Sequence, residues 1–218
     1  MIKAFATAAL ALSLAFSGAP AAAQDETPSP AAAPATVDFD MTHEPENILL
    51  LDLSNNQRVA IRLMPQWAPQ HVERIKTIAR QGFYNGIIFH RVIDGFMAQT
   101  GDPTGTGTGG SPLPDLKQEF NPSPHLRGTV SMARSASEDS ANSQFFIVFY
   151  PRFALDKKYT NFGRVISNMA GVDAINRGEP PEDPTWIVQA TIAADGIPQK
   201  FAPAVATAAP AEIPTSTN

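Results

Sequence analysis

The sequence predicts a mainly β domain, a closed antiparallel barrel capped by helices. Three observations lead to this prediction. Apolar residues gather in many short runs, few stretches show helical spacing, and 14 glycines and 20 prolines repeatedly interrupt the runs. Short strands separated by turn residues are typical of all-β folds, and closing a sheet into a barrel removes its unpaired edges.

The domain is expected to begin with a hairpin whose strands lie in residues 47–53 and 58–64, around a polar turn. Two prolines end this pattern. Apolar side chains then recur at helical spacing in residues 70–82, where Gly82 ends the helix. A second, short helix is expected near residues 171–177. Further strands are predicted in the remaining apolar runs, residues 86–93, 96–100, 129–133, 143–150, 160–166 and 186–194.

Composition divides the chain into four parts. Residues 1–23 read as a cleaved export signal, because Lys3 precedes an apolar stretch too short to span a bilayer well and small residues follow it. Retention of this segment as an anchor is the alternative. Residues 24–44 are expected to form a disordered Ala/Pro-rich tether and residues 197–218 a flexible tail, since both have few large apolar groups. Residues 45–196 form the globular domain.

Charge and residue types exclude several classes of function. The formal net charge of −5 leaves no basic footprint for a nucleic acid. The chain has no cysteine, which excludes disulfides, thiolate metal sites and thiol catalysis. The histidines show no metal-ligand spacing. We therefore expect neither a metal nor a nucleic-acid partner.

A hairpin around Asp94 brings polar and apolar side chains together. A two-residue loop there would pair Arg91 with Ala98. A three-residue loop would instead pair Arg91 with Gln99 and place Met97 on the same face. We favour the second register because the two polar groups can then satisfy each other beside apolar surface, although the spacing leaves both open.

The chemistry of this hairpin points to binding rather than hydrolysis. A guanidinium is always charged and cannot act as a base, so Arg91 is a positioned donor. Aromatic, thioether and amide groups beside it suit a ligand with an apolar body and a polar backbone. No Ser-His-Asp set or pair of carboxylates stands out, so a secreted hydrolase ranks low. The glycines at 105, 107 and 110 match G-x-G-x-x-G, but the prolines after them leave no helix N-terminus for a phosphate.

Four segments share their order and approximate spacing with a known family: FHRVIDGFMAQTGDPTGTGTGG, GTVSMARS, NSQFFIVF and LDKKYTNFGRVI. Together they resemble the cyclophilins, peptidyl-prolyl cis-trans isomerases, in a bacterial exported form. The similarity runs from about residue 45 to residue 194. It implies an eight-stranded barrel, a substrate groove on the outer face of that barrel, and a periplasmic protein that assists the folding of exported proteins.

The resemblance also implies roles for individual residues. Arg91 takes the catalytic place, where a fixed donor aimed at the prolyl nitrogen stabilises the twisted bond more than the planar one. No cofactor is needed. The partners are proline-containing polypeptides, and the protein is expected to be a monomer. The substrate-binding positions are Phe96, Met97, Gln99, Ala133, Arg134, Gln144, Phe146, Leu155 and Tyr159.

Three positions depart from familiar members of the family. Ala154 stands where they carry tryptophan, Tyr159 where they carry histidine, and Arg134 where many carry asparagine. Loss of the indole removes a donor and a wall of the pocket, so we expect weak binding of cyclosporin. The main alternative is a proline-peptide binding or holdase module with little turnover. Arg91 argues against it, because a pure binder needs no donor at the prolyl nitrogen.

Overall fold

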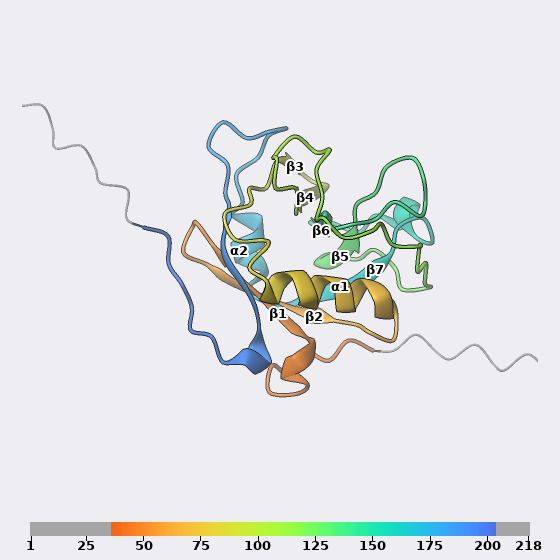
Figure 1. Ribbon diagram of the computed structural model, residues 1–218, viewed down its shortest axis with the longest axis horizontal. Coiled ribbons are helices and arrows are strands. Elements are labelled where there is room, and N and C mark those ends of the chain that lie inside the picture. The colour runs from red at the N-terminus through yellow and green to blue at the C-terminus, as the bar shows by residue number, and fades with distance from the viewer. Residues whose placement is uncertain (1–35, 204–218) are drawn as a thin grey trace, which may run out of the picture. The chain divides into compact units, whose positions relative to one another are not determined.

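The computed structural model describes residues 36–203, and Figure 1 shows their arrangement. The predicted signal at residues 1–23, most of the predicted tether and residues 204–218 of the predicted tail lie outside the described residues. None of the described helices is long and apolar enough to cross a membrane. The elements in chain order are η1 (Pro45–Asn47), β1 (Ile48–Leu53), β2 (Arg58–Leu63), α1 (Pro69–Arg80), β3 (Arg91–Ile93), β4 (Met97–Thr100), β5 (Thr129–Met132), β6 (Phe145–Val148), η2 (Phe153–Leu155), β7 (Asn161–Ser167), α2 (Met169–Asp173), β8 (Ile187–Ile192) and η3 (Ala193–Asp195).

The strands form one antiparallel sheet of eight, in the order β3-β4-β6-β5-β7-β2-β1-β8. The prediction of a closed barrel is wrong, because β3 and β8 are the two edges and do not pair as strands. The sheet is an open, curled half-barrel. Just before β3, residues 86–89 form backbone hydrogen bonds with residues 185–187, around an isolated bridge between Ile88 and Trp186.

The free edge of β3 bonds to a residue of a loop instead of to β8. The backbone of Val92 in β3 exchanges two hydrogen bonds with Gly178, N···O 2.7 and 2.9 Å. Gly178 lies in the loop between α2 and β8. Since β3 has only three residues, these two bonds use most of its edge. They also fix the position of the residue that follows, Glu179.

The main core lies on the concave face of the sheet, where residues of every strand, including Val92 of β3, pack with Tyr84 and Phe89. The helix α1 begins at Pro69, which suits a first helical position because proline has no N–H to leave unsatisfied. It buries Val72, Ile75 and Ile78 against this core at the spacing that the sequence predicted. Figure 1 shows α1 lying across the sheet.

Both ends of the described chain contact the domain. The guanidinium of Arg62, only 2% exposed, donates hydrogen bonds to backbone oxygens of Asp38, Asp40 and His43, residues of the predicted tether. After β8, the backbone N–H of Lys200 donates to the carboxylate of Asp52 at 2.8 Å. The domain therefore holds residues 38–43 and 200 through buried polar side chains of β1 and β2.

Candidate active site

The hairpin of β3 and β4 has the register that we favoured. Arg91 pairs with Gln99 and Ile93 with Met97, around a three-residue turn that ends at Phe96. Because side chains alternate along a strand, Met97 and Gln99 share one face of the sheet while Ala98 points into the main core. The prediction of this register is confirmed.

A pocket of about 240 Å³ lies on the opposite face of the sheet from the main core. Its floor is a separate apolar cluster, in which Met97 of β4 meets Phe146 and Val148 of β6. The strand pairing explains this contact, since Gln99 lies opposite Phe146 and Met97 opposite Val148. The lining comprises every predicted site residue except Gln144: Arg91, Phe96, Met97, Gln99, Ala133, Arg134, Phe146, Leu155 and Tyr159.

Arg91 is held at the edge of this pocket by two side chains. Its Nε donates to Oε2 of Glu179 at 2.8 Å, and its Nη1 reaches Oε1 of Gln99 at 3.5 Å. The third guanidinium nitrogen, Nη2, has no hydrogen-bond partner among residues 36–203. The side chain is 40% exposed and that of Glu179 is 53% exposed, so a ligand can reach the pair. A guanidinium fixed at two nitrogens presents the third as a preorganised donor.

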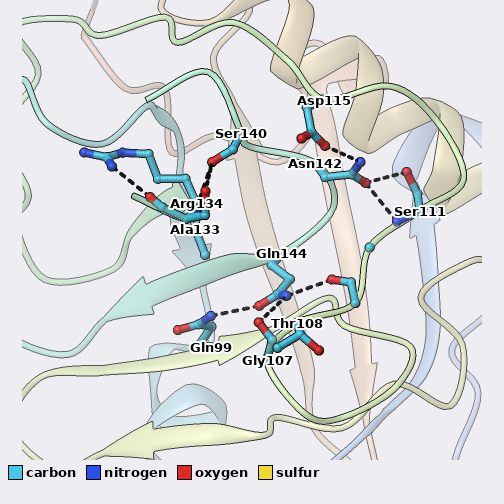
Figure 2. Close-up of a pocket in the computed structure, with 13 residues that line it drawn as sticks. Gln99, Gly107, Thr108, Ser111, Asp115, Ala133, Arg134, Ser140, Asn142 and Gln144 are labelled. Carbon is cyan, nitrogen blue, oxygen red and sulfur yellow. Dashed lines mark hydrogen bonds between the residues drawn. The ribbon is translucent and has the colours of Figure 1, made fainter. Parts of the chain in front are cut away.

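Gln144 links the pocket to a second, more polar hollow of about 480 Å³. Its Oε1 accepts from Nε2 of Gln99 at 2.9 Å, and its own Nε2 donates to the carbonyls of Gly107 and Gly109 at 3.0 and 2.8 Å. Figure 2 shows Gln144 between Gln99 and the glycine loop. A chain of amides thus runs from Arg91 to the loop, and Gln144 lines the neighbouring hollow instead of the apolar pocket.

Arg134 lines both hollows. Its guanidinium lies over the ring of Tyr159, 4.9 Å from the ring centre, and Nη2 donates to the carbonyl of Lys158 at 3.0 Å. The Tyr159 ring in turn meets Phe146 edge-on, with ring centres 5.6 Å apart. The arrangement can hold a compact apolar ring against Met97 and Phe146, with a charged donor on one side and polar groups along the approach.

This combination agrees with the comparisons with known proteins. The model of the cyclophilin-type peptidyl-prolyl cis-trans isomerase family matches residues 49–194, about two thirds of the chain. This chain belongs to the cyclophilins. It is therefore a peptidyl-prolyl cis-trans isomerase by family, and the eight-stranded sheet with its helices is the cyclophilin fold.

Relatives and solved structures support the assignment. A probable peptidyl-prolyl cis-trans isomerase of Brucella suis is 48% identical over 168 residues, which cover 70% of this chain and 85% of that protein. One from Helicobacter pylori is 45% identical over 130 residues, 58% of this chain and 78% of that one. A crystal structure of a Hirschia baltica cyclophilin is 29% identical, with a TM-score of 0.64 over 70% of this chain and 76% of that one.

A Cryptosporidium parvum cyclophilin-type isomerase, crystallised in the presence of the dipeptide Ala-Pro, is 26% identical to this cyclophilin. The TM-score is 0.62, over 66% of this chain and 98% of that one.

A hydrogen-bonded serine, histidine and aspartate, which the sequence pattern does not reveal, lie beneath the pocket of this cyclophilin. Ser131 Oγ lies 2.9 Å from His125 Nε2, and His125 Nδ1 lies 2.8 Å from Asp156. Ser131 is 0% exposed, so no substrate can reach it as a nucleophile. The His125 ring instead stacks under Phe146, with centres 6.4 Å apart. Burial lowers the pKa of His125, against the opposing effect of Asp156.

His90, which directly precedes β3, is a further buried histidine. It is 5% exposed, and neither ring nitrogen has a hydrogen-bond partner within the described part of the chain. Burial lowers its pKa, so its neutral form is favoured. Residues 36–203 contain no group of three or more acidic or histidine side chains that could hold a metal ion.

Proposed function

We propose that this cyclophilin isomerises X-Pro bonds of exported proteins, with Arg91 as the residue that stabilises the twisted amide. Rotation about a peptide bond breaks its conjugation and faces a barrier of roughly 18–20 kcal/mol. The proline ring would enter the pocket over Met97 and Phe146. There the free Nη2 of Arg91 can donate to the prolyl nitrogen, whose lone pair becomes available only as the bond twists.

The observation that carries this proposal is the guanidinium of Arg91 anchored at Nε and Nη1 beside an apolar pocket. The remaining predicted residues have complementary roles in this pocket. Phe96, Leu155 and Tyr159 would form walls for the proline ring, and Ala133, Arg134 and Gln144 would line the path of the peptide. The crystallisation of a related cyclophilin with Ala-Pro supports a proline peptide as the ligand.

Exchange NMR on an Ala-Pro peptide tests the proposal. The wild-type protein should speed cis-trans exchange, and Arg91→Ala should remove most of the enhancement while the peptide still binds. Arg127→Ala is a matched control, because Arg127 forms a similar exposed pair with Asp173 and does not line the pocket. Binding by the wild type without faster exchange would instead support a holdase, and equal loss in both variants would argue against a special role for Arg91.

We further propose a periplasmic location, after cleavage of residues 1–23, and a role in folding exported proteins as a monomer. The charge, apolar stretch and small residues of the N-terminal segment support this location. The mass of the protein recovered from a periplasmic fraction tests the cleavage, and recovery of the full-length mass would contradict it. Refolding of a proline-limited periplasmic protein, with and without the cyclophilin, tests the folding role.

We also propose that this cyclophilin binds cyclosporin weakly. Ala154 is exposed on η2 and does not line the pocket, so no large ring extends the pocket wall at this position. Inhibition at low nanomolar cyclosporin would contradict this expectation.

A further inference from the structure

Two guanidinium groups flank the apolar pocket by lying over its aromatic walls. Arg134 lies over Tyr159, 4.9 Å from the ring centre, and Arg152 lies over Phe96, 5.3 Å from the ring centre. Both rings line the pocket, so each charge is placed beside the space that a proline would occupy. An arginine over an aromatic face is stabilised there by the ring's electrons.

Backbone oxygens hold these two arginines without neutralising them. Arg134 donates to the carbonyls of Lys158 and Ser135, and Nη2 of Arg152 donates to the carbonyl of Gly95 at 2.6 Å. Within the described part of the chain, neither forms an ion pair. Carbonyl bonds fix a guanidinium but leave its net charge in place.

Other arginines of this region are neutralised. Arg91 pairs with Glu179, Arg127 with Asp173, and Arg177 with Asp94. The contrast shows that positive charge is left uncompensated at Arg134 and Arg152 in particular.

Two lysines extend the same charge. Lys157 and Lys158 are exposed on the turn between two pocket residues, Leu155 and Tyr159, and neither has an ion-pair partner among residues 36–203. The one carboxylate in this turn, Asp156, is bound to His125. We call Arg134, Arg152, Lys157 and Lys158 the cationic rim. Of these four residues Arg134 lines the pocket and the other three lie beside its lining residues, in a protein whose formal net charge is −5.

We infer that the cationic rim makes this isomerase prefer prolines that have an aspartate or glutamate as an immediate neighbour. The inference rests on the proposed function of the pocket and adds the class of sequence that it selects. A proline seated over Phe146 places its neighbouring side chains at the pocket edge, where the rim lies. Exposed charges attract an oppositely charged residue modestly and lose that attraction as salt screens them.

Matched peptides test the preference. Three sets carry Glu, Gln or Lys immediately before or immediately after a single proline, and exchange NMR gives kcat/KM for each against its own uncatalysed rate. At an ionic strength of about 0.01 M, the better-placed Glu peptide should exceed its Gln counterpart by about threefold to tenfold, and the Lys peptide should fall below it. The ratio should approach one at about 0.5 M salt, where screening is nearly complete.

Variants locate the cause of the preference. Arg152→Gln combined with Lys158→Gln should reduce the Glu-to-Gln ratio towards one. Lys200→Gln removes the same kind of charge from the segment that packs beside Asp52, away from the pocket lining, and should leave the ratio as in the wild type. Melting temperatures of all variants establish that each is folded.

The outcomes separate this inference from the proposed function. A Glu-to-Gln ratio near one at low salt, with the Gln peptide still catalysed, overturns the inference alone. A ratio that survives high salt or the double substitution also overturns it. If no peptide shows faster exchange, the proposed catalysis fails, and dissociation constants from titrations of the same samples then decide whether the rim prefers acidic neighbours.

Discussion

Replacement of Arg91 by lysine should nearly abolish catalysis although it keeps the positive charge. The guanidinium uses Nε for Glu179 at 2.8 Å and Nη1 for Gln99 at 3.5 Å, which leaves Nη2 for the substrate. An ammonium has one nitrogen on a flexible stem and cannot hold both partners while it reaches the prolyl nitrogen. Removal of one preorganised donor at a transition state lowers rates by about 10²- to 10³-fold. Because Arg91 is 40% exposed, we expect the lower end of this range.

The assay for Arg91→Lys is exchange NMR with the Ala-Pro peptide, together with peptide affinity and thermal unfolding. Affinity should change little, since Met97 and Phe146 still form the pocket floor. Stability should change by no more than about 0.5 kcal/mol, as is usual for surface substitutions. If the lysine variant keeps a rate within about threefold of the wild type, fixed guanidinium geometry is not what catalyses rotation, and simple positive charge suffices.

Three further outcomes are expected. Glu179→Gln should lower kcat by about twofold to fivefold with little change in KM or stability, because it weakens an exposed pair that orients Arg91; an unchanged kcat would make that pair a surface contact only. The free energy of unfolding, measured with urea, should decrease as the pH is lowered from about 7.5 to about 5. Burial lowers the folded-state pKa of three histidines below their ordinary value of 6.5, so over this range the unfolded chain takes up protons at these histidines and the folded chain does not. A flat profile would contradict this. These histidines are His71, His90 and His125. Ala154→Trp should strengthen cyclosporin inhibition by about tenfold, since a large ring would extend the pocket wall; an unchanged inhibition constant would show that position 154 does not limit binding.

Much of the fold could be predicted because local patterns carry it. The hairpin of β1 and β2, the helix α1 and the strand β8 all follow from apolar periodicity bounded by turn residues. The register of β3 and β4 was predicted by an argument about partners, since only one loop length lets Arg91 and Gln99 meet. Each of these features depends on residues close together in the sequence.

Closure of the barrel was predicted wrongly because it depends on a contact between distant residues. The free edge of β3 bonds to Gly178 instead of to β8, and Gly178 lies 86 positions after its partner Val92 with no strand pattern around it. A Cβ at Gly178 would lie 2.5 Å from Cα of Pro181, so the tight loop that delivers this residue requires glycine. Nothing in the periodicity of the sequence marks such a position.

The candidate site, like the fold, could be predicted from the sequence only in part. The residues that line the apolar pocket lie in short segments whose order resembles that of a family, and those segments could be recognised directly. The buried groups beneath these residues could not be recognised from the sequence. His125 and Ser131 lie six residues apart, Asp156 lies 31 residues after His125, and the three are related only by 2.8–2.9 Å contacts in the fold.

The open edge of the sheet and the orientation of Arg91 have one cause. Because Val92 bonds to Gly178 in place of a strand, the chain passes beside β3 and puts the next carboxylate, Glu179, within 2.8 Å of Arg91 Nε. A closed barrel would have placed a strand of alternating side chains along this edge, with no turn to present an acidic residue there. The two backbone bonds of Val92 therefore place Glu179 so that one nitrogen of Arg91 is fixed while its side chain stays 40% exposed.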